Sequence, residues 1–218
     1  MYLHLCYLDL KLETVTSFKY LGPVITDEGS KPEIFSRIAQ TTAALTISKP
    51  VWNGKSISLI SKIRLIRSLV IPIFLYVCES WTPTAELQRR IQDVEMERYR
   101  KVRRIFYKDH VTTEKVDAKI QQAIGPHEDL LTIVKRRKLQ WYGHVSRSSG
   151  LAKTILQGTV KAGRRQGGQR KSWEDNIREW TGLEFAKFQR AVENRAKRRK
   201  LVVKPSVLPQ RPSRLRDR

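Results

Sequence analysis

One apolar segment in the first half of the chain, SISLISKIRLIRSLVIPIFLYVCESW at residues 56–81, constrains the fold most. Its apolar residues recur at helical spacing and form one stripe along a long helix. Residues 69–78 are apolar nearly all the way round, which predicts the buried centre of a helical bundle. Pro72 removes a backbone hydrogen bond and clashes with the preceding turn, so we expect a kink or a break near residues 68–71.

A membrane span is the competing interpretation of this segment. A transmembrane helix needs about 20 consecutive apolar residues, and the uninterrupted apolar run is only about half that long. Residues 1–10 lack the basic start and long apolar centre of a signal peptide, and no lipidation motif is present. Cys6 and Cys78 give no disulfide framework. We therefore expect an intracellular protein, of the nucleus or cytoplasm, that is neither secreted nor bound to a membrane.

The charge of the chain points to a polyanionic partner. Lysine and arginine number 43 against 21 acidic residues, a formal net charge of +22. Self-repulsion of this size favours binding to a polyanion such as nucleic acid. RNA and DNA are therefore the expected partners, and we expect no small-molecule substrate.

The periodicity predicts a mainly α fold, a helical bundle with a short N-terminal β-hairpin and a disordered basic C-terminal tail. Strands are expected at residues 2–12 and 17–26, joined around 13–16. Serines at positions 30, 56 and 172 are the expected helix N-caps. Helices are expected at residues 32–49, 56–81, 84–107, 113–124 and 129–148, then from residue 173, and at 184–199. The predicted domains are residues 1–28 (hairpin), 29–110 (helical bundle), 111–202 (helical basic region) and 203–218 (tail).

A basic turn in the helix expected at 129–148 is the first candidate phosphate site. Trp141 follows it directly, and an aromatic ring beside cations can stack on a base while the cations hold phosphates. The competing interpretation, which we favour for Trp141, is that its ring extends the buried stripe begun by Leu130 and Val134. The candidate phosphate contacts of this turn are Lys135, Arg136, Arg137 and Lys138.

A glycine-rich basic loop, KAGRRQGGQRK at residues 161–171, is the second candidate. It leads into the helix that Ser172 is expected to cap, where free amides and the helix dipole add to the cations. The glycine spacing matches neither the P-loop nor the dinucleotide motif, so it does not indicate nucleotide binding. Its candidate residues are Arg164, Arg165, Arg170 and Lys171.

The helix expected at 84–107 carries many arginines, and Arg103 and Arg104 are its candidate phosphate contacts. A solvated face explains the charge of this helix equally well.

The sequence predicts no catalytic or metal-binding residues. A zinc site needs about four Cys, His or acidic ligands at short spacing, and Cys6 and Cys78 lie far apart. Cys78 lies in the apolar segment, where an inert buried thiol is expected. Capping and dipole complementation explain Glu174 and Asp175.

Several stretches taken together resemble the C-terminal part of the endonuclease and reverse transcriptase polyprotein of LINE-type (non-long-terminal-repeat) retrotransposons. The stretch FKYLG at 18–22 resembles the hairpin that follows the catalytic palm strands in that family. Three further stretches resemble the thumb helices of that family: KIRL at 62–65, LVIP at 69–72 and ESW at 79–81. Three more resemble the connector that follows the thumb: RKLQWYGHV at 137–145, GRR at 163–165 and WED at 173–175. The resemblance covers about residues 12–200.

The resemblance implies a thumb and connector that hold template and primer. Lys19 and Tyr20 would then lie near a primer end, as part of a primer grip. Polymerases of that family hold two magnesium ions with an aspartate pair in a Tyr-x-Asp-Asp turn. This chain has no adjacent aspartates. We therefore expect no cofactor and no enzyme activity of the chain on its own, and a palm-containing reverse transcriptase chain is a further candidate partner.

Our leading hypothesis is a non-catalytic, nucleic-acid-binding fragment of a retrotransposon RNA-directed DNA polymerase that contacts template and primer phosphates. One alternative is a helical protein-interaction module, whose binding to partners would persist at high salt. A second is a split enzyme completed by a palm-containing chain, and a third is a degenerate retroelement remnant without independent function.

The glycine-rich loop gives a first test. Replacing Arg164, Arg165 and Arg170 with alanine should weaken binding to structured RNA at low salt, because three phosphate-binding charges are lost. Unchanged binding in a gel-shift titration would count against the loop.

Overall fold

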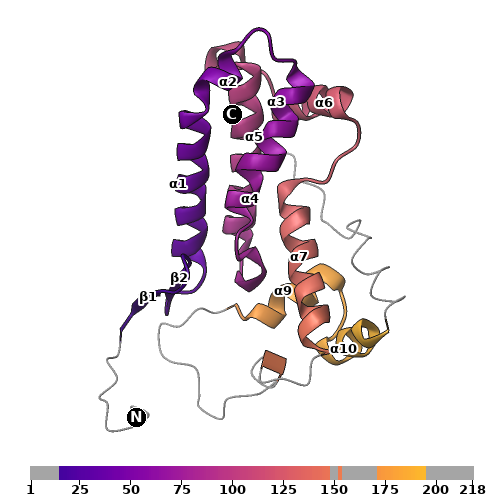
Figure 1. Ribbon diagram of the computed structural model, residues 1–218. Helices are drawn as coiled ribbons and strands as arrows, with labels where there is room; N and C mark the ends of the chain where they lie inside the picture. The colour runs from indigo at the N-terminus through magenta and orange to yellow at the C-terminus, as the bar shows by residue number, and fades with distance from the viewer. Residues whose placement is uncertain (1–14, 148–151, 154–170, 195–218) are drawn as a thin grey trace, which may run out of the picture.

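Helix α5 (Ala85–Arg103) is the longest element, and α1 (Lys31–Ile47), α3 (Leu59–Leu65) and α7 (Leu130–Val145) pack along it (Figure 1). The computed structural model describes residues 15–147, 152–153 and 171–194. The predicted mainly α class, with one short hairpin near the N-terminus, is confirmed. None of the helices in the described ranges has the length and apolarity needed to cross a bilayer. The tail predicted at 203–218 lies outside the described residues.

The hairpin is shorter than predicted and closes within residues 17–26. Strand β1 (Ser17–Lys19) pairs antiparallel with β2 (Val24–Thr26), so that Phe18 faces Ile25. The intervening turn forms because Leu21 and Gly22 both have positive φ angles, of 52° and 108°. The pairing expected between residues 2–12 and 17–26 was therefore wrong for 17–26, whose two halves pair with each other. Residues 2–12 lie outside the described part.

A buried ion pair of helix α1 holds the hairpin. The Glu33 carboxylate accepts a 2.7 Å hydrogen bond from the Val24 amide and a 2.6 Å hydrogen bond from Arg37 Nε. The Arg37 guanidinium in turn lies 4.7 Å from the ring centroid of Tyr76, whose hydroxyl donates to the Leu21 carbonyl at 3.1 Å. Glu33 therefore links α1 to strand β2.

Serine caps also differ from their predicted positions. Ser30 precedes α1, but its hydroxyl accepts from the Thr82 amide at 2.8 Å and makes no cap hydrogen bond. Helix α3 is capped by Ser58, which accepts from the Ser61 amide at 3.2 Å; Ser56 was the wrong choice. The predicted cap at Ser172 is confirmed, as a capping box with Asp175.

The apolar segment breaks where the proline predicts. Helix α3 leads into a π-helical turn (Ile66–Val70), and the short helix α4 (Ile71–Phe74) carries Pro72 in its first turn. The helical part ends sooner than expected. Val77 adopts a left-handed conformation with φ 58°, and a 3-10 turn (Cys78–Ser80) follows. Trp81 lies beyond it, 1% exposed, with its ring edge-on to Phe74 at 5.3 Å.

The expected helix at 32–49 ends early, at Ile47, and a short helix that was not predicted follows, α2 (Lys49–Asn53), with Pro50 in its first turn. A 3-10 turn (Tyr107–Asp109) follows α5. Helix α6 (Thr113–Ile124) has the predicted bounds, and α7 is slightly shorter than expected. Helices α9 (Trp173–Thr181) and α10 (Phe185–Glu193) come last.

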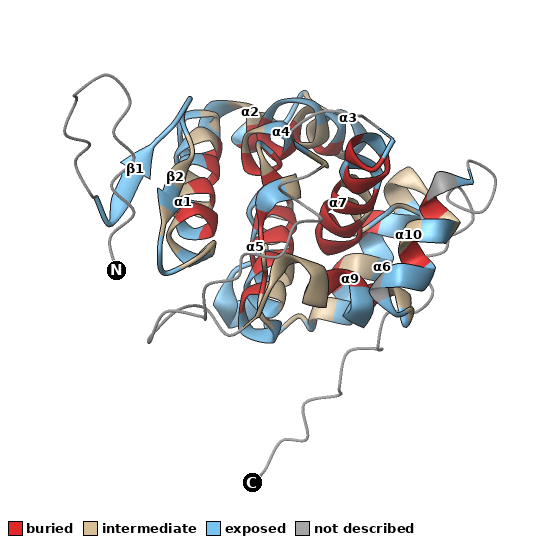
Figure 2. Cartoon of the chain, turned by 90° about the horizontal axis from the view of Figure 1, so that it is seen from below, coloured by how far each residue is buried: buried red, intermediate tan, exposed pale blue. Residues whose placement is uncertain are grey.

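The buried residues lie where the helices face one another (Figure 2). The buried apolar side chains of the described residues form three groups. The largest group joins α1, α4 and α5 to the start of α7. The second lies between α3, α5 and α6, and the third between α7, α9 and α10. The main core thus contains residues from both sides of position 110, where the sequence had suggested a domain boundary.

Phe74 offers a direct test of this core, because it is fully buried against Trp81. Phe74→Ala should lower the free energy of unfolding by about 3–5 kcal/mol, measured by urea denaturation. Phe106→Ala is the matched control, since Phe106 is 68% exposed and should change stability by less than about 0.5 kcal/mol. Equal effects of the two substitutions would contradict this placement of the core.

Candidate nucleic-acid interface

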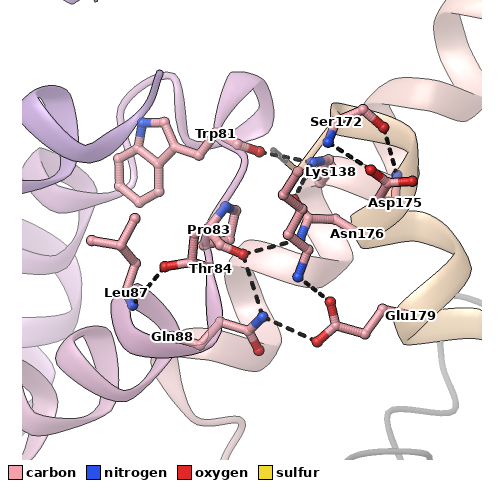
Figure 3. A network of polar contacts seen from close by, with 11 residues as sticks. Trp81, Pro83, Thr84, Leu87, Gln88, Lys138, Ser172, Asp175, Asn176 and Glu179 are labelled. Carbon is pink, nitrogen blue, oxygen red and sulfur yellow. Dashed lines mark hydrogen bonds and ion pairs between the residues drawn. The ribbon is translucent and has the colours of Figure 1, made fainter. Parts of the chain in front are cut away.

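The basic turn of α7 points largely inward. Lys138 is 0% exposed, and its Nζ donates to the Trp81 carbonyl at 2.7 Å and to Asn176 Oδ1 at 3.1 Å (Figure 3). The Nζ atom also lies 4.5 Å from the ring centroid of Trp173 and 5.3 Å from that of Trp180. The prediction that Lys138 contacts phosphate is therefore corrected, because the side chain is enclosed between three segments of the chain.

Burial changes the protonation of this lysine. Removal from water, with a smaller effect of the Lys171 charge, lowers the pKa of Lys138 to about 6. Lys135 is also buried, at 7% exposed, with Nζ 5.4 Å from the Trp180 ring centroid. Burial lowers the pKa of Lys135 as well. Neither lysine offers an open ammonium group to a polyanion.

The two arginines of the turn have partners within the protein. Arg136 Nη2 lies 2.9 Å from Glu128 Oε2, an ion pair at the surface. Arg137 Nη1 donates to the Leu75 carbonyl at 3.3 Å and lies 4.0 Å from Glu79 Oε1. The turn as a whole joins α7 to the rest of the fold.

A signal for this arrangement was present in the sequence. Lys135 and Lys138 fall on one helical stripe with Leu131 and Tyr142, and all four side chains are buried. Trp141 lies next to this stripe and is 38% exposed, with its ring edge-on to Trp173 at 5.6 Å. Its neighbour Tyr142 is fully buried. The interpretation that Trp141 extends the buried stripe of this helix was therefore wrong by one residue.

The second candidate cluster is described only at its end. Arg164, Arg165 and Arg170 lie outside the described residues. Lys171 forms an ion pair with Glu179, and Glu179 also accepts from Gln88 Nε2 at 3.4 Å (Figure 3). The ion pair joins the start of α9 to its last turn, and the Gln88 hydrogen bond links α9 to α5.

The hairpin residues Lys19 and Tyr20 are both exposed. Tyr20 is 57% exposed and its ring stacks on Phe18, with 6.5 Å between the ring centroids. The hairpin lies at the opposite end of α1 from α2, so these residues are distant from α2 and the loop that follows it (Figure 1).

Arg103 and Arg104 do lie together in a surface pocket. The pocket has a volume of about 280 Å³ and lies between the segment that follows α2 and the end of α5. Arg104 ends α5 in a left-handed conformation, with φ 53°, and its guanidinium donates to the Asn53 carbonyl. Lys62 Nζ donates to the Gly54 carbonyl at 2.7 Å. The lining residues are Asn53, Gly54, Lys55, Leu59, Lys62, Val102, Arg103 and Arg104.

We call the four cations of this pocket, Lys55, Lys62, Arg103 and Arg104, the basic pocket cluster. Among the residues that the structure describes, none with a carboxylate lines the pocket. Sequence reasoning found the two arginines but missed the two lysines as site residues. They come about 40 positions earlier, and nothing in the helical periodicity links them to the end of α5. No group of His, Cys, Asp and Glu suited to a metal ion occurs among the described residues.

Helix α5 also turns two charges into the core. Glu95 accepts a 2.8 Å hydrogen bond from the Leu130 amide, the first of α7, and burial raises the pKa of Glu95 to about 7. Arg98 is 2% exposed, and its guanidinium lies 5.1 Å from the Phe74 ring centroid. Burial lowers the pKa of Arg98 to about 10.

One comparison with curated proteins finds a relative. The chain is similar to an uncharacterized transposon-derived protein of Caenorhabditis elegans, with 29% identity over 140 residues. That stretch is 63% of this chain and 49% of the relative, so the chain matches about half the length of that protein. The similarity suggests a transposon origin. No family model matches the chain. No solved structure matches it either.

The buried Lys138 predicts a specific pH dependence of stability. The unfolded chain protonates this amine up to its ordinary pKa of 10.5, whereas the folded chain does so only below about 6. Between these values a proton stabilises only the unfolded state, so the folded state gains stability from this group as pH rises. Relative to Lys138→Met, wild-type protein should gain roughly 1 kcal/mol per pH unit across this window.

Urea denaturation of both proteins at several pH values measures this difference. A parallel series with Lys119→Met, at an exposed lysine of α6, accounts for the loss of one surface charge. A difference between wild type and Lys138→Met that stays constant with pH would contradict the burial of Lys138.

Proposed function

We propose that the chain is a non-catalytic, nucleic-acid-binding part of a transposon-encoded protein, and that the parent protein is a LINE-type RNA-directed DNA polymerase. The observation that carries the proposal is the basic pocket cluster, four cations from two distant segments around a pocket without a carboxylate. The net charge of +22 and the similarity to a transposon-derived protein support it. The reverse transcriptase assignment rests on the motif resemblance.

Several further cations lie on α3, on α6 and in the 3-10 turn that follows α5, and the helices α3, α5 and α6 contact one another. They are exposed and form no ion pair within the described part of the chain. A phosphate backbone can contact such residues at many angles, because lysine and arginine side chains are long and carry several donors. The residues are Arg64, Lys108, Lys115 and Lys119.

Binding of this kind is electrostatic and reads little sequence. Contacts to phosphate position a protein on nucleic acid, whereas contacts to base edges specify the sequence. The only apolar residues of the pocket are Leu59 and Val102, and it has no aromatic ring on which a base could stack. The protein would hold template and primer, and a palm-containing chain would supply the catalytic centre.

A protein-interaction module is the second candidate function, and the hairpin favours it. Phe18, Tyr20, Leu21 and Ile25 are each more than half exposed. Exposed apolar side chains that lie close together on a two-stranded hairpin are typical of a surface that binds another protein.

Salt dependence of binding tests the first proposal. The full-length chain should bind single-stranded RNA and duplex DNA in fluorescence anisotropy at low salt. If four phosphates are neutralised, affinity for duplex DNA should fall roughly 100-fold between about 50 and 200 mM salt. Absence of binding at low salt, or affinity that salt does not change, would reject nucleic-acid binding by charge.

A further inference from the structure

We infer that the basic pocket cluster forms a dedicated site for a single phosphate group, in which a phosphate of the bound nucleic acid is held. The inference rests on the proposed function and adds to it one defined contact point. A surface covered with cations binds a polyanion anywhere, whereas a pocket fixes the register of one phosphate relative to the helices.

The pocket is held open from within. Lys62 donates to the Gly54 carbonyl and Arg104 to the Asn53 carbonyl, so two of the four cations fix the loop that forms one wall. Each uses only part of its hydrogen-bonding capacity in this way, since an ammonium has three donors and a guanidinium five. Donors therefore remain for a ligand without any loss of the loop contacts.

The other two cations, Lys55 and Arg103, make no loop contact of this kind among the described residues. Lys55 is exposed and, within the described part of the chain, makes no hydrogen bond or ion pair. Arg103 Nε is shielded from solvent and has no hydrogen-bond partner there. A buried donor without an acceptor is costly, and an anion that draws the guanidinium into a new position relieves that cost.

The volume of the pocket and the electrostatic field of its four cations both suit a phosphate group. A volume of about 280 Å³ is near the lower limit for ligand pockets, which favours a phosphate with its sugar over a whole dinucleotide. The negative end of the α5 dipole points here and opposes an anion, but it amounts to roughly half a charge. The C-terminal carbonyls of Arg100 and Lys101 also accept bonds from the Ile105 and Arg104 amides. Four full positive charges outweigh this effect.

The decisive variant is Lys55→Gln/Arg103→Gln, which removes two pocket charges and leaves both loop hydrogen bonds in place. The matched control is Arg89→Gln/Lys31→Gln, which removes one arginine and one lysine that are exposed and outside the pocket. Anisotropy with a labelled single-stranded RNA at low salt should show at least about 10-fold weaker binding for the pocket variant. The control should lose less than about 3-fold, because exposed charges contribute little individually.

Competition with inorganic phosphate at constant ionic strength distinguishes binding at a defined phosphate site from non-specific attraction to a positively charged surface. It should displace the RNA from wild type and from the control, and displace it less from the pocket variant. Equal affinities of the two variants, or displacement that does not depend on the pocket, would overturn the inference.

Direct phosphate binding separates this inference from the proposed function. If wild type binds no RNA or DNA, the proposed function fails. The pocket is then supported by a shift of the Gly54 amide signal in NMR on addition of phosphate, lost in the pocket variant, and its ligand would be a small phosphorylated molecule. Absence of that shift would overturn the pocket as a phosphate site.

Discussion

The extended backbone around Trp81 needs hydrogen-bond donors, and meeting that need organises the second half of the fold. Residues 81–84 lie outside any helix or strand, yet Trp81 and Pro83 are buried. A buried carbonyl without a partner is unfavourable. Three side chains of α7 and α9 supply donors to this region, from Trp173 to the Glu79 carbonyl at 3.0 Å, from Lys138 to Trp81 at 2.7 Å, and from Asn176 to Pro83 at 3.0 Å. Helices α7 and α9 are thereby fixed to the end of the apolar segment.

This requirement explains which parts of the structure the sequence could predict. Several local signals were reliable, as shown by the break before Pro72, the bounds of α6 and the capping box at Ser172, whereas the predicted cap at Ser56 and the strand pairing were wrong. Other failures arose where a polar residue has a distant partner. Ser30 bonds to Thr82, and Lys138 bonds to Trp81. No local pattern identifies such partners, because spacing along a helix describes only the helix itself.

The candidate site shows the same limit. A run of four basic residues in sequence suggested a phosphate-binding surface, but the fold uses that turn to join its own elements. Charges that the sequence separates by about 40 residues, Lys62 and Arg103, instead share one pocket. The surplus of positive charge in the composition predicts a polyanionic partner but not where that partner would bind. Its location depended on tertiary contacts between α3 and α5.

The central claim is that Lys138 is enclosed while Lys55 is open, and amine-selective labelling followed by mass spectrometry tests it most directly. A lysine with a lowered pKa reacts quickly if reagent can reach it, so slow labelling of Lys138 in the native protein would report its burial alone. The account predicts that Lys138 is modified only after denaturation, whereas Lys55 is modified at once. Labelling of Lys138 in the native protein as fast as Lys55 would contradict the account.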